Sequence, residues 1–192
     1  MKFGDAVLPG ATALCAAAAF AMLPMAPARG DDANPLVALV DAAAQRLQTA
    51  DPVAATKWIK GGSIEDPPRV EQVLSTVAAD ANRRGVDSGY VRRIFTDQID
   101  ATTGIEYTRF GQWKLDPSLA PAQAPDLTAS RDVIDRLNAQ MVEQIAAQSP
   151  VLHSPDCLRT LDDAKATVAA ARTLDPLYRQ GLDYSTHSYC GA

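Results

Sequence analysis

The chain has 192 residues, of which 47% are hydrophobic, and a formal net charge of -5 at pH 7. That length and apolar content predict one packed domain and exclude a chain that is disordered throughout. The acidic balance argues against a nucleic-acid partner, which needs a basic face, and against a surface held to anionic lipid.

The start of the chain is typical of a targeting segment rather than of a fold. Lys2 precedes a small-residue apolar run over residues 11–25, and Ala26-Pro27-Ala28 supplies the small side chains that signal peptidase requires. We therefore expect a signal peptide over residues 1–28. The mature domain, residues 29–192, would be exported to a periplasm or secreted, with no membrane contact after cleavage. A retained membrane anchor is the alternative, but the apolar run is short for a span and prolines interrupt it.

The rest of the chain has helical periodicity. Apolar residues recur at spacings of three and four, and no segment alternates long enough to predict a strand. Asn-Pro and Asp-Pro pairs mark helix starts, and glycines mark helix ends. At Asp51-Pro52 the chain either begins a new helix or kinks. The expected helices cover about residues 34–47, 51–60, 66–84, 87–114, 126–148, 155–172 and 176–186. The sequence therefore predicts an all-α bundle of about six helices.

Export decides how the cysteines are interpreted. Cys15 would leave with the signal peptide, and Cys157 and Cys190 remain as a pair in an oxidising compartment. One disulfide between them would join the C-terminal helical pair and contribute roughly 3–4 kcal/mol in the chain-entropy model. Two buried free thiols are the alternative.

Several charged side chains border the apolar helix faces. Arg46 and Lys57 are eleven residues apart, almost three helical turns, so they share a face if the helix continues through Pro52. Asp66 and Arg69 are three apart and lie within side-chain reach on one turn. These residues fit a pocket for a small dianion. The ordinary alternative is that the cations reach into water and that Asp66 is only a helix cap.

Three further candidates lie later in the chain. Thr102 and Glu106 are four residues apart, on one face of the long helix. Arg131 lies in the first turn of its helix, where a cation opposes the helix dipole, so local helix stability does not explain it. The alternative for Thr102 is a hydrogen bond to its own backbone.

Motifs for other chemistries do not occur in the sequence. His153 and His187 have no second ligand at metal spacing, so no metal site is expected. Gly61-Gly62 opens no strand–turn–helix unit of the kind that holds phosphate. No nucleophile elbow accompanies a Ser-His-Asp set.

Five blocks of sequence, in order, resemble a known family. They are "LVDAAAQRLQTADPVAATKW", "IEDPPRVEQ", "DQIDATTGIEY", "FGQWKLDP" and "DLTASRDVIDRLN". With the late cysteine pair, they make the mature chain similar to the exported, gamma-subclass form of the all-helical (AroQ-type) chorismate mutases. The resemblance implies rearrangement of chorismate to prephenate with no cofactor or metal, and a homodimer with a complete site in each chain.

The resemblance also implies how the substrate is gripped. Arg46 and Arg131 would pair with the two carboxylates of chorismate, and Arg69 would support that grip. Thr102 would hydrogen-bond a carboxylate. Guanidinium forks suit this task because they bind carboxylates in a fixed geometry.

The reacting part of chorismate would meet a second group of residues. The resemblance implies that Lys57 and Glu106 flank the ether oxygen, which gains negative charge in the transition state. A preorganised donor at that atom favours the transition state over the ground state. Asp66 would orient Arg69 or Lys57, or contact the substrate.

One position departs from the family pattern. Relatives can hold the ring hydroxyl with a Glu or Gln just after the residue equivalent to Arg69. Here Val70 and Val73 stand one and four residues after Arg69, and Gln72 is the neighbouring amide. The competing interpretation of the whole chain is an exported, non-enzymatic helical bundle that binds a small dianion or a protein. An enzyme requires six side chains to converge on one cavity, whereas a non-enzymatic bundle does not. These are Arg46, Lys57, Arg69, Thr102, Glu106 and Arg131.

Overall fold

The computed structural model describes Met1 and residues 33–191. The chain divides into two units, Met1–Asp31 and Asp32–Ala192, and the fold reported below is that of the second unit. The expected signal peptide, residues 1–28, lies outside the described residues apart from Met1.

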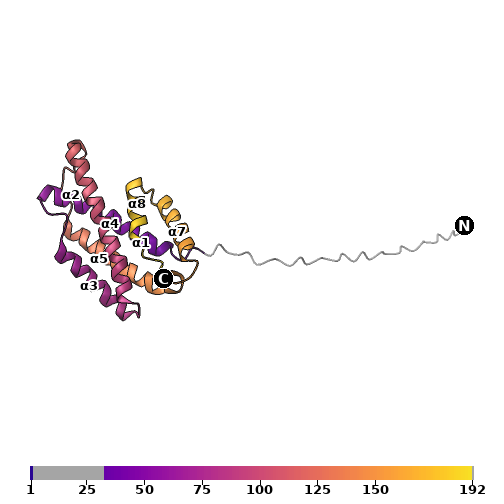
Figure 1. Ribbon diagram of the computed structural model, residues 1–192. Coiled ribbons are helices and arrows are strands. Elements are labelled where there is room, and N and C mark those ends of the chain that lie inside the picture. Colours follow the sequence, from indigo (N-terminus) through magenta and orange to yellow (C-terminus); the bar gives the residue numbers. More distant parts are fainter. Residues whose placement is uncertain (2–32, 192) are drawn as a thin grey trace. The chain divides into compact units, whose positions relative to one another are not determined.

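The second unit is all-helical over its described residues, with eight α-helices and one 3-10 helix (Figure 1). They are α1 (Val37–Gln48), α2 (Ala50–Lys60), α3 (Pro67–Arg83), α4 (Ser88–Leu115), η1 (Pro117–Leu119), α5 (Leu127–Ala147), α6 (Ser149–Leu152), α7 (Cys157–Ala171) and α8 (Pro176–Ser185). The predicted all-α bundle is confirmed. The structure has more α-helices than the predicted number of about six, because α1 and α2 are separate helices and α6 is an additional short one.

Capping side chains and glycines set the helix ends. The carboxylates of Asp66, Asp87 and Asp126 each accept a hydrogen bond from a backbone N–H in the first turns of α3, α4 and α5. Gly61 and Gly85, which follow α2 and α3, both have φ of 73°, a left-handed conformation that other residues disfavour. These are the starts and stops that the sequence predicts.

The chain passes from α1 to α2 with almost no break. Thr49, between them, keeps right-handed helical dihedrals of φ -70° and ψ -11°. The N–H of Val53 donates to the carbonyl oxygen of Thr49 at 3.2 Å. Pro52 lies in the first turn of α2, where a missing N–H leaves no helical hydrogen bond unmade. The helical path therefore continues through Pro52, between Arg46 and Lys57.

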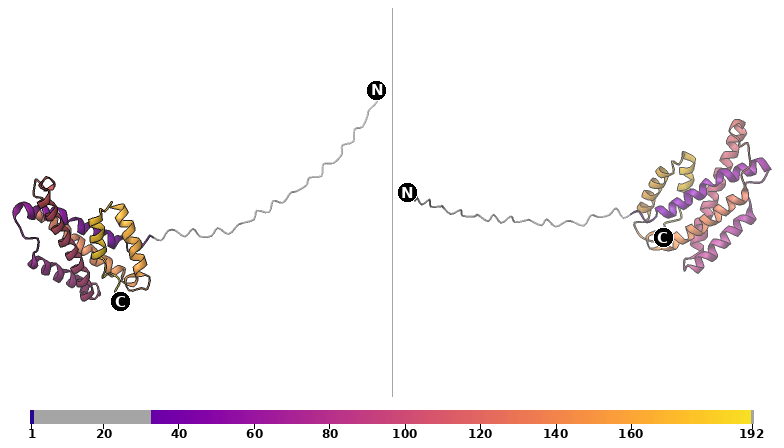
Figure 2. Two further views of the ribbon diagram at one scale, coloured as in Figure 1. Left: turned by 45° about the horizontal axis from the view of Figure 1, so that its top comes forward. Right: turned by 180° about the vertical axis from the view of Figure 1, so that it is seen from behind.

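Two helices carry most of the packing. The long α4 packs against α2, α3 and α8, while α1 packs against α5, α7 and α8 (Figures 1 and 2). Leu39, Val40 and Leu47 of α1 are fully buried in the main core. This arrangement leaves the α1–α2 path, α3, α4 and α5 surrounding one cavity, and keeps α7 and α8 on the other side of α1.

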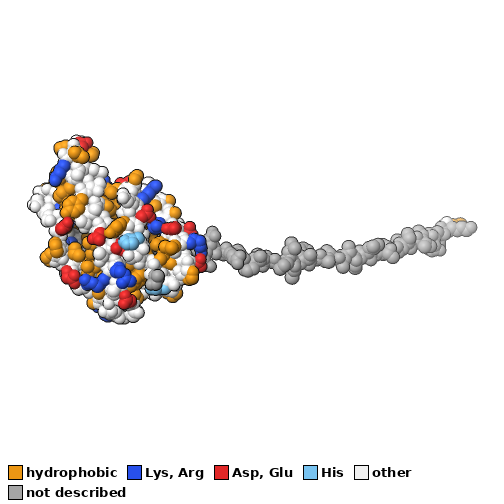
Figure 3. Space-filling model, in the orientation of Figure 1, with side chains coloured by type: hydrophobic (Ala, Val, Ile, Leu, Met, Phe, Trp, Pro, Cys, Tyr) orange, Lys and Arg blue, Asp and Glu red, His pale blue; other side chains and the backbone are white. Residues whose placement is uncertain are grey.

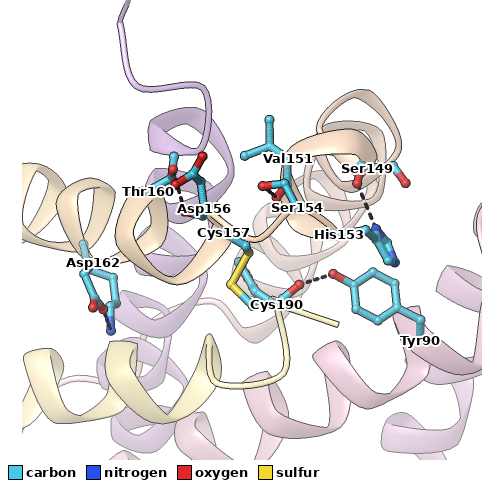
Figure 4. Close-up of a disulfide and its surroundings, with 12 residues drawn as sticks. Tyr90, Ser149, Val151, His153, Ser154, Asp156, Cys157, Thr160, Asp162 and Cys190 are labelled. Carbon is cyan, nitrogen blue, oxygen red and sulfur yellow. Dashed lines mark hydrogen bonds and ion pairs between the residues drawn. A yellow bond between two sulfur atoms is a disulfide. The ribbon is translucent and has the colours of Figure 1, made fainter. Parts of the chain in front are cut away.

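The disulfide lies in the C-terminal helical pair. Cys157 at the start of α7 is bonded to Cys190, which follows α8, with the two Cα atoms 5.7 Å apart (Figure 4). Beside it, the buried hydroxyl of Tyr90 donates to the backbone carbonyl oxygen of Tyr189. The predicted pairing is confirmed. The disulfide ties the end of the chain to α7, and the hydrogen bond of Tyr90 ties it to α4.

Replacing both Cys157 and Cys190 by serine is expected to lower the free energy of unfolding by about 3 kcal/mol, because the unfolded chain is then no longer constrained by the loop. Urea denaturation followed by circular dichroism measures this. Wild-type protein treated with a reductant should unfold at the same urea concentration as the double variant. A difference between oxidised wild type and double variant below about 1 kcal/mol would contradict the expectation.

Acidic and basic side chains are interspersed on the face that Figure 3 shows. His153 and His187 are exposed, and the described residues contain no group of acidic, histidine and cysteine side chains placed to hold a metal ion. Of the helices that the structure describes, none combines the length and apolar character that a membrane span requires.

Candidate active site

A cavity of about 410 Å³ opens between the α1–α2 path, α3, α4 and α5. Apolar side chains such as Val53, Ile64 and Ile134 supply part of its wall. The polar part of the wall includes all seven residues that the sequence singles out: Arg46, Lys57, Asp66, Arg69, Thr102, Glu106 and Arg131. Residues from five helical segments, up to 85 positions apart in the chain (46 to 131), therefore face one space.

Arg46 is the deepest cation of the cavity, with only 4% of the residue exposed. Its Nε donates to Oδ1 of Asn138 at 2.7 Å. Its Nη1 lies 3.4 Å from the hydroxyl oxygen of Thr102 and 3.5 Å from the carbonyl oxygen of Gln98. Among the described residues, no carboxylate pairs with this guanidinium. No protein atom of these residues accepts a hydrogen bond from its Nη2.

Burial makes the charge of Arg46 costly for the folded protein. Burial lowers the pKa of its guanidinium from 12.5 to about 10, which leaves it protonated at neutral pH. At about 1.4 kcal/mol per pKa unit, the folded protein bears a penalty on the order of 3 kcal/mol for this charge. A bound anion beside Arg46 would offset that penalty.

Lys57 and Glu106 form a second, largely buried pair. Lys57 Nζ lies 2.8 Å from Glu106 Oε2, and the two side chains are 16% and 6% exposed. The same ammonium donates to the carbonyl oxygen of Ile64 at 2.5 Å. Burial raises the pKa of Glu106, and the hydrogen bond and charge of Lys57 oppose that rise without cancelling it. The pair thus holds a cation next to a carboxyl group that protonates more readily than an exposed one.

Arg69 and Arg131 lie nearer the mouth of the cavity, and each has a carboxylate partner. Arg69 Nη2 is 2.5 Å from Asp135 Oδ1, and its Nη1 donates to Gln72 at 3.0 Å. Arg131 Nη2 is 3.1 Å from Asp66 Oδ2, and its side chain is 44% exposed. Each of these cations already holds a carboxylate. A second anion would bind through the remaining N–H groups of the guanidinium or would displace that carboxylate.

Asp66 makes two contacts, one as a helix cap and one as an ion-pair partner. One carboxylate oxygen accepts the backbone N–H of Arg69 at 3.2 Å, so it caps α3, and the other pairs with the side chain of Arg131. Its carboxylate thus orients Arg131; the predicted contact to the side chain of Arg69 or Lys57 is not found.

Thr102, Val70 and Val73 all line the cavity. The hydroxyl of Thr102 donates to the carbonyl oxygen of Gln98 at 2.7 Å, the backbone bond considered as its alternative role. Val70 and Val73 line the cavity, whereas the amide of Gln72 is engaged by Arg69. The cavity wall just after Arg69 is therefore apolar at residues 70 and 73.

Other carboxylates also line the cavity, and most of them are engaged. Glu71 pairs with Arg92 at 3.3 Å, and Glu65 accepts a hydrogen bond from a tyrosine hydroxyl at 3.0 Å. Asp100 has no ion-pair partner among the described residues. The cavity is thus lined by both signs of charge, and its two most buried charged residues are Arg46 and Glu106, each 4% exposed.

Sequence reasoning missed the residues that contact Arg46, Arg69 and Thr102, namely Asn138, Asp135 and Gln98. Asn138 and Asp135 follow Arg131 by seven and four residues, which places them on the same face of α5, and Gln98 precedes Thr102 by four on α4. That spacing is the signal that could have found them. Without a structure, a single amide or carboxylate within a helix has no motif to mark it.

The fold and the site together define an all-helical bundle with a cavity whose wall includes a buried arginine that no carboxylate contacts among the described residues. The family described as Chorismate mutase type II matches residues 37–107 of the chain. The chain is 61% identical over 163 residues to a secreted chorismate mutase of Mycolicibacterium smegmatis, covering 85% of this chain and 90% of that protein.

Two further comparisons agree with these. A secreted chorismate mutase of Mycobacterium tuberculosis is 50% identical over 165 residues, covering 86% of this chain and 83% of that protein. The crystal structure of a chorismate mutase from Burkholderia phymatum superposes with a TM-score of 0.78 at 30% identity, over 83% of this chain and 98% of that one. The chain belongs to the all-helical chorismate mutase family.

Proposed function

We propose that the cavity binds chorismate and rearranges it to prephenate. The observation that carries this proposal is Arg46, a buried guanidinium with no carboxylate partner among the described residues, in a cavity that also holds the Lys57–Glu106 pair. Chorismate is a compact dicarboxylate, so it supplies the anion that Arg46 lacks. The reaction needs one reactant held in a folded conformer, and a rigid cavity on helices suits that task.

In this proposal the arginines grip the substrate. Arg46 pairs with one carboxylate through its free Nη2, and Arg131 pairs with the other at the mouth of the cavity. Arg69 supports the grip from its pair with Asp135, and Thr102 hydrogen-bonds a carboxylate once its hydroxyl turns from the backbone. Fixing both carboxylates brings the reacting carbons close together, which removes part of the entropic barrier.

Lys57 and Glu106 act on the ether oxygen. During the rearrangement the ether C–O bond breaks while a new C–C bond forms, and no proton or electron passes to or from the protein. Negative charge develops on the ether oxygen, and the Lys57 ammonium and a protonated Glu106 donate hydrogen bonds to it. Because these donors are held in place before the reaction, they stabilise the transition state more than the substrate.

The protonation of Glu106 predicts how the rate depends on pH. Its folded-state pKa is raised, so the protonated, donating form is lost as the pH rises through that raised value. We expect kcat/KM of the wild type to fall with rising pH, approaching tenfold per pH unit, and the Glu106→Gln variant to show a flatter profile. Glu143→Gln, at an exposed position of α5, is the control and should keep the wild-type profile. Equal profiles for Glu106→Gln and wild type would exclude Glu106 as the titrating donor.

The direct test of the proposed function is the loss of chorismate absorbance on adding the purified protein. Rapid loss with formation of prephenate is expected without any added cofactor. A folded protein that binds prephenate but consumes no chorismate would instead be a non-enzymatic dianion-binding bundle.

We further propose that residues 1–28 are removed on export and that the mature chain forms a homodimer. The names of the two mycobacterial relatives support export. Large apolar side chains are exposed at the ends of α2 and α4 and in η1, a surface that a second copy could cover: Ile59, Tyr107, Leu115 and Leu119. N-terminal sequencing should begin at Arg29, and light scattering should give twice the mass of the mature chain.

A further inference from the structure

The three arginines of the cavity differ in what holds them. Arg69 is paired with Asp135 and Arg131 with Asp66, so both are held by carboxylates. Arg46 is held only by neutral oxygen atoms, of which the amide oxygen of Asn138 is the closest at 2.7 Å. The deepest cation is therefore the one that no carboxylate of the described residues contacts directly, and the charge of Asp135 acts on it only from a distance.

Asn138 holds Arg46 from outside the cavity. It is 5% exposed on α5, next to the buried Leu137, and it is not among the residues that line the cavity. Its Oδ1 faces Nε, the nitrogen nearest the arginine stem. Since Nε can only donate, the contacting atom of Asn138 must be its oxygen. The contact fixes the guanidinium plane and leaves Nη2 for a ligand.

We infer that Asn138 is a positioning residue that anchors Arg46 through a neutral acceptor, so that the full charge of Arg46 serves the substrate carboxylate. The inference rests on the proposed function. An aspartate in the same place would make an equally good hydrogen bond and would remove the cost of the unpaired charge. It would also put a negative charge beside the site of the substrate carboxylate.

The test compares two substitutions that nearly keep the shape of Asn138. Asn138→Asp changes the charge of the anchor, and Asn138→Leu removes the acceptor. Prephenate binding by the full purified protein is measured by calorimetry, with thermal melting alongside. Asn82→Asp makes the same chemical change at an exposed position of α3 and is the matched control.

We expect the affinity for prephenate to fall in the order wild type, Asn138→Leu, Asn138→Asp. Coulomb's law at an effective dielectric constant of about 20 and a separation of about 6 Å gives a weakening on the order of 100-fold for Asn138→Asp. The loss of orientation in Asn138→Leu should cost about tenfold. The melting temperatures should follow a different order. Asn138→Asp should melt at or above the temperature of the wild type. Asn138→Leu should melt at a lower temperature, because leucine leaves Nε of Arg46 unpaired.

A purely structural role for Asn138 predicts that the more stable variant binds better, which is the reverse of our expectation for the two variants. Binding by Asn138→Asp within threefold of wild type would overturn the inference. If Asn138→Asp does not fold, wild-type affinity in Asn138→Leu would overturn it equally, and a tenfold loss would support it. Failure of the wild type to consume chorismate would instead refute the proposed function.

Discussion

Replacing Arg46 by methionine is expected to lower kcat/KM for chorismate by about 10³-fold without lowering the stability of the folded protein. The loss follows because a charged hydrogen-bonding partner of a substrate carboxylate typically contributes several kcal/mol. Stability is expected to hold because the substitution removes a buried charge whose penalty is on the order of 3 kcal/mol, as the lowered pKa indicates. That gain exceeds the roughly 1–2 kcal/mol cost of leaving the amide oxygen of Asn138 unpaired.

Steady-state kinetics and urea denaturation of the same samples measure both effects. The matched control is Arg136→Met, at an exposed position of α5, which should leave both unchanged. If the free energy of unfolding of Arg46→Met is more than about 2 kcal/mol below that of the wild type, Arg46 stabilises the fold. The buried charge would then no longer be an argument for a bound anion beside Arg46.

Replacing Lys57 by methionine should lower kcat by about 10² to 10³-fold, with a smaller effect on KM. The methionine keeps most of the apolar stem but removes the donor to the ether oxygen, and a single donor of this kind has about that effect. Because Lys57 is also the group that opposes the rise in the pKa of Glu106, its loss should raise that pKa further. The residual activity should therefore persist to a higher pH than the activity of the wild type.

Measuring kcat and KM over a series of pH values tests both parts of this prediction. Lys60→Met replaces an exposed lysine on the same helix and is expected to behave as wild type. A kcat within threefold of wild type for Lys57→Met would exclude Lys57 as a transition-state donor. A large loss of kcat with an unshifted pH profile would separate Lys57 from the ionisation of Glu106.

Most of the fold follows from local chemistry that is visible in the sequence. Asp66, Asp87 and Asp126 cap the helices that they were expected to start, because a short carboxylate satisfies first-turn N–H groups. The sequence predicts that one helix ends near residue 148 and that the next begins near residue 155, with Ser149-Pro150 between them. A proline is also compatible with the first turn of a new helix, and the chain forms the short α6 there. Sequence alone does not decide between these two uses.

The candidate site was partly visible for a similar reason. Charged residues such as Arg46, Lys57 and Arg131 stand out where helical spacing places them beside an apolar face. Their partners depend on how helices pack: Asp66 meets Arg131 from 65 positions away, and Arg46 meets Asn138 from 92 positions away. No local pattern encodes such contacts. Asn138 was therefore missed as the partner of Arg46, and Asp66 was expected to hold Arg69 or Lys57 rather than Arg131.

The almost unbroken path from α1 to α2 has a consequence for how this region can vary. Eleven residues carry the chain from Arg46 to Lys57, close to a whole number of turns. One inserted residue would rotate Lys57 by about 100° and carry it off the cavity, whereas a change of side chain between them would leave its direction intact. Variation in this segment is therefore constrained in length more than in composition, and a natural or designed variant can exchange residues here but cannot gain or lose one.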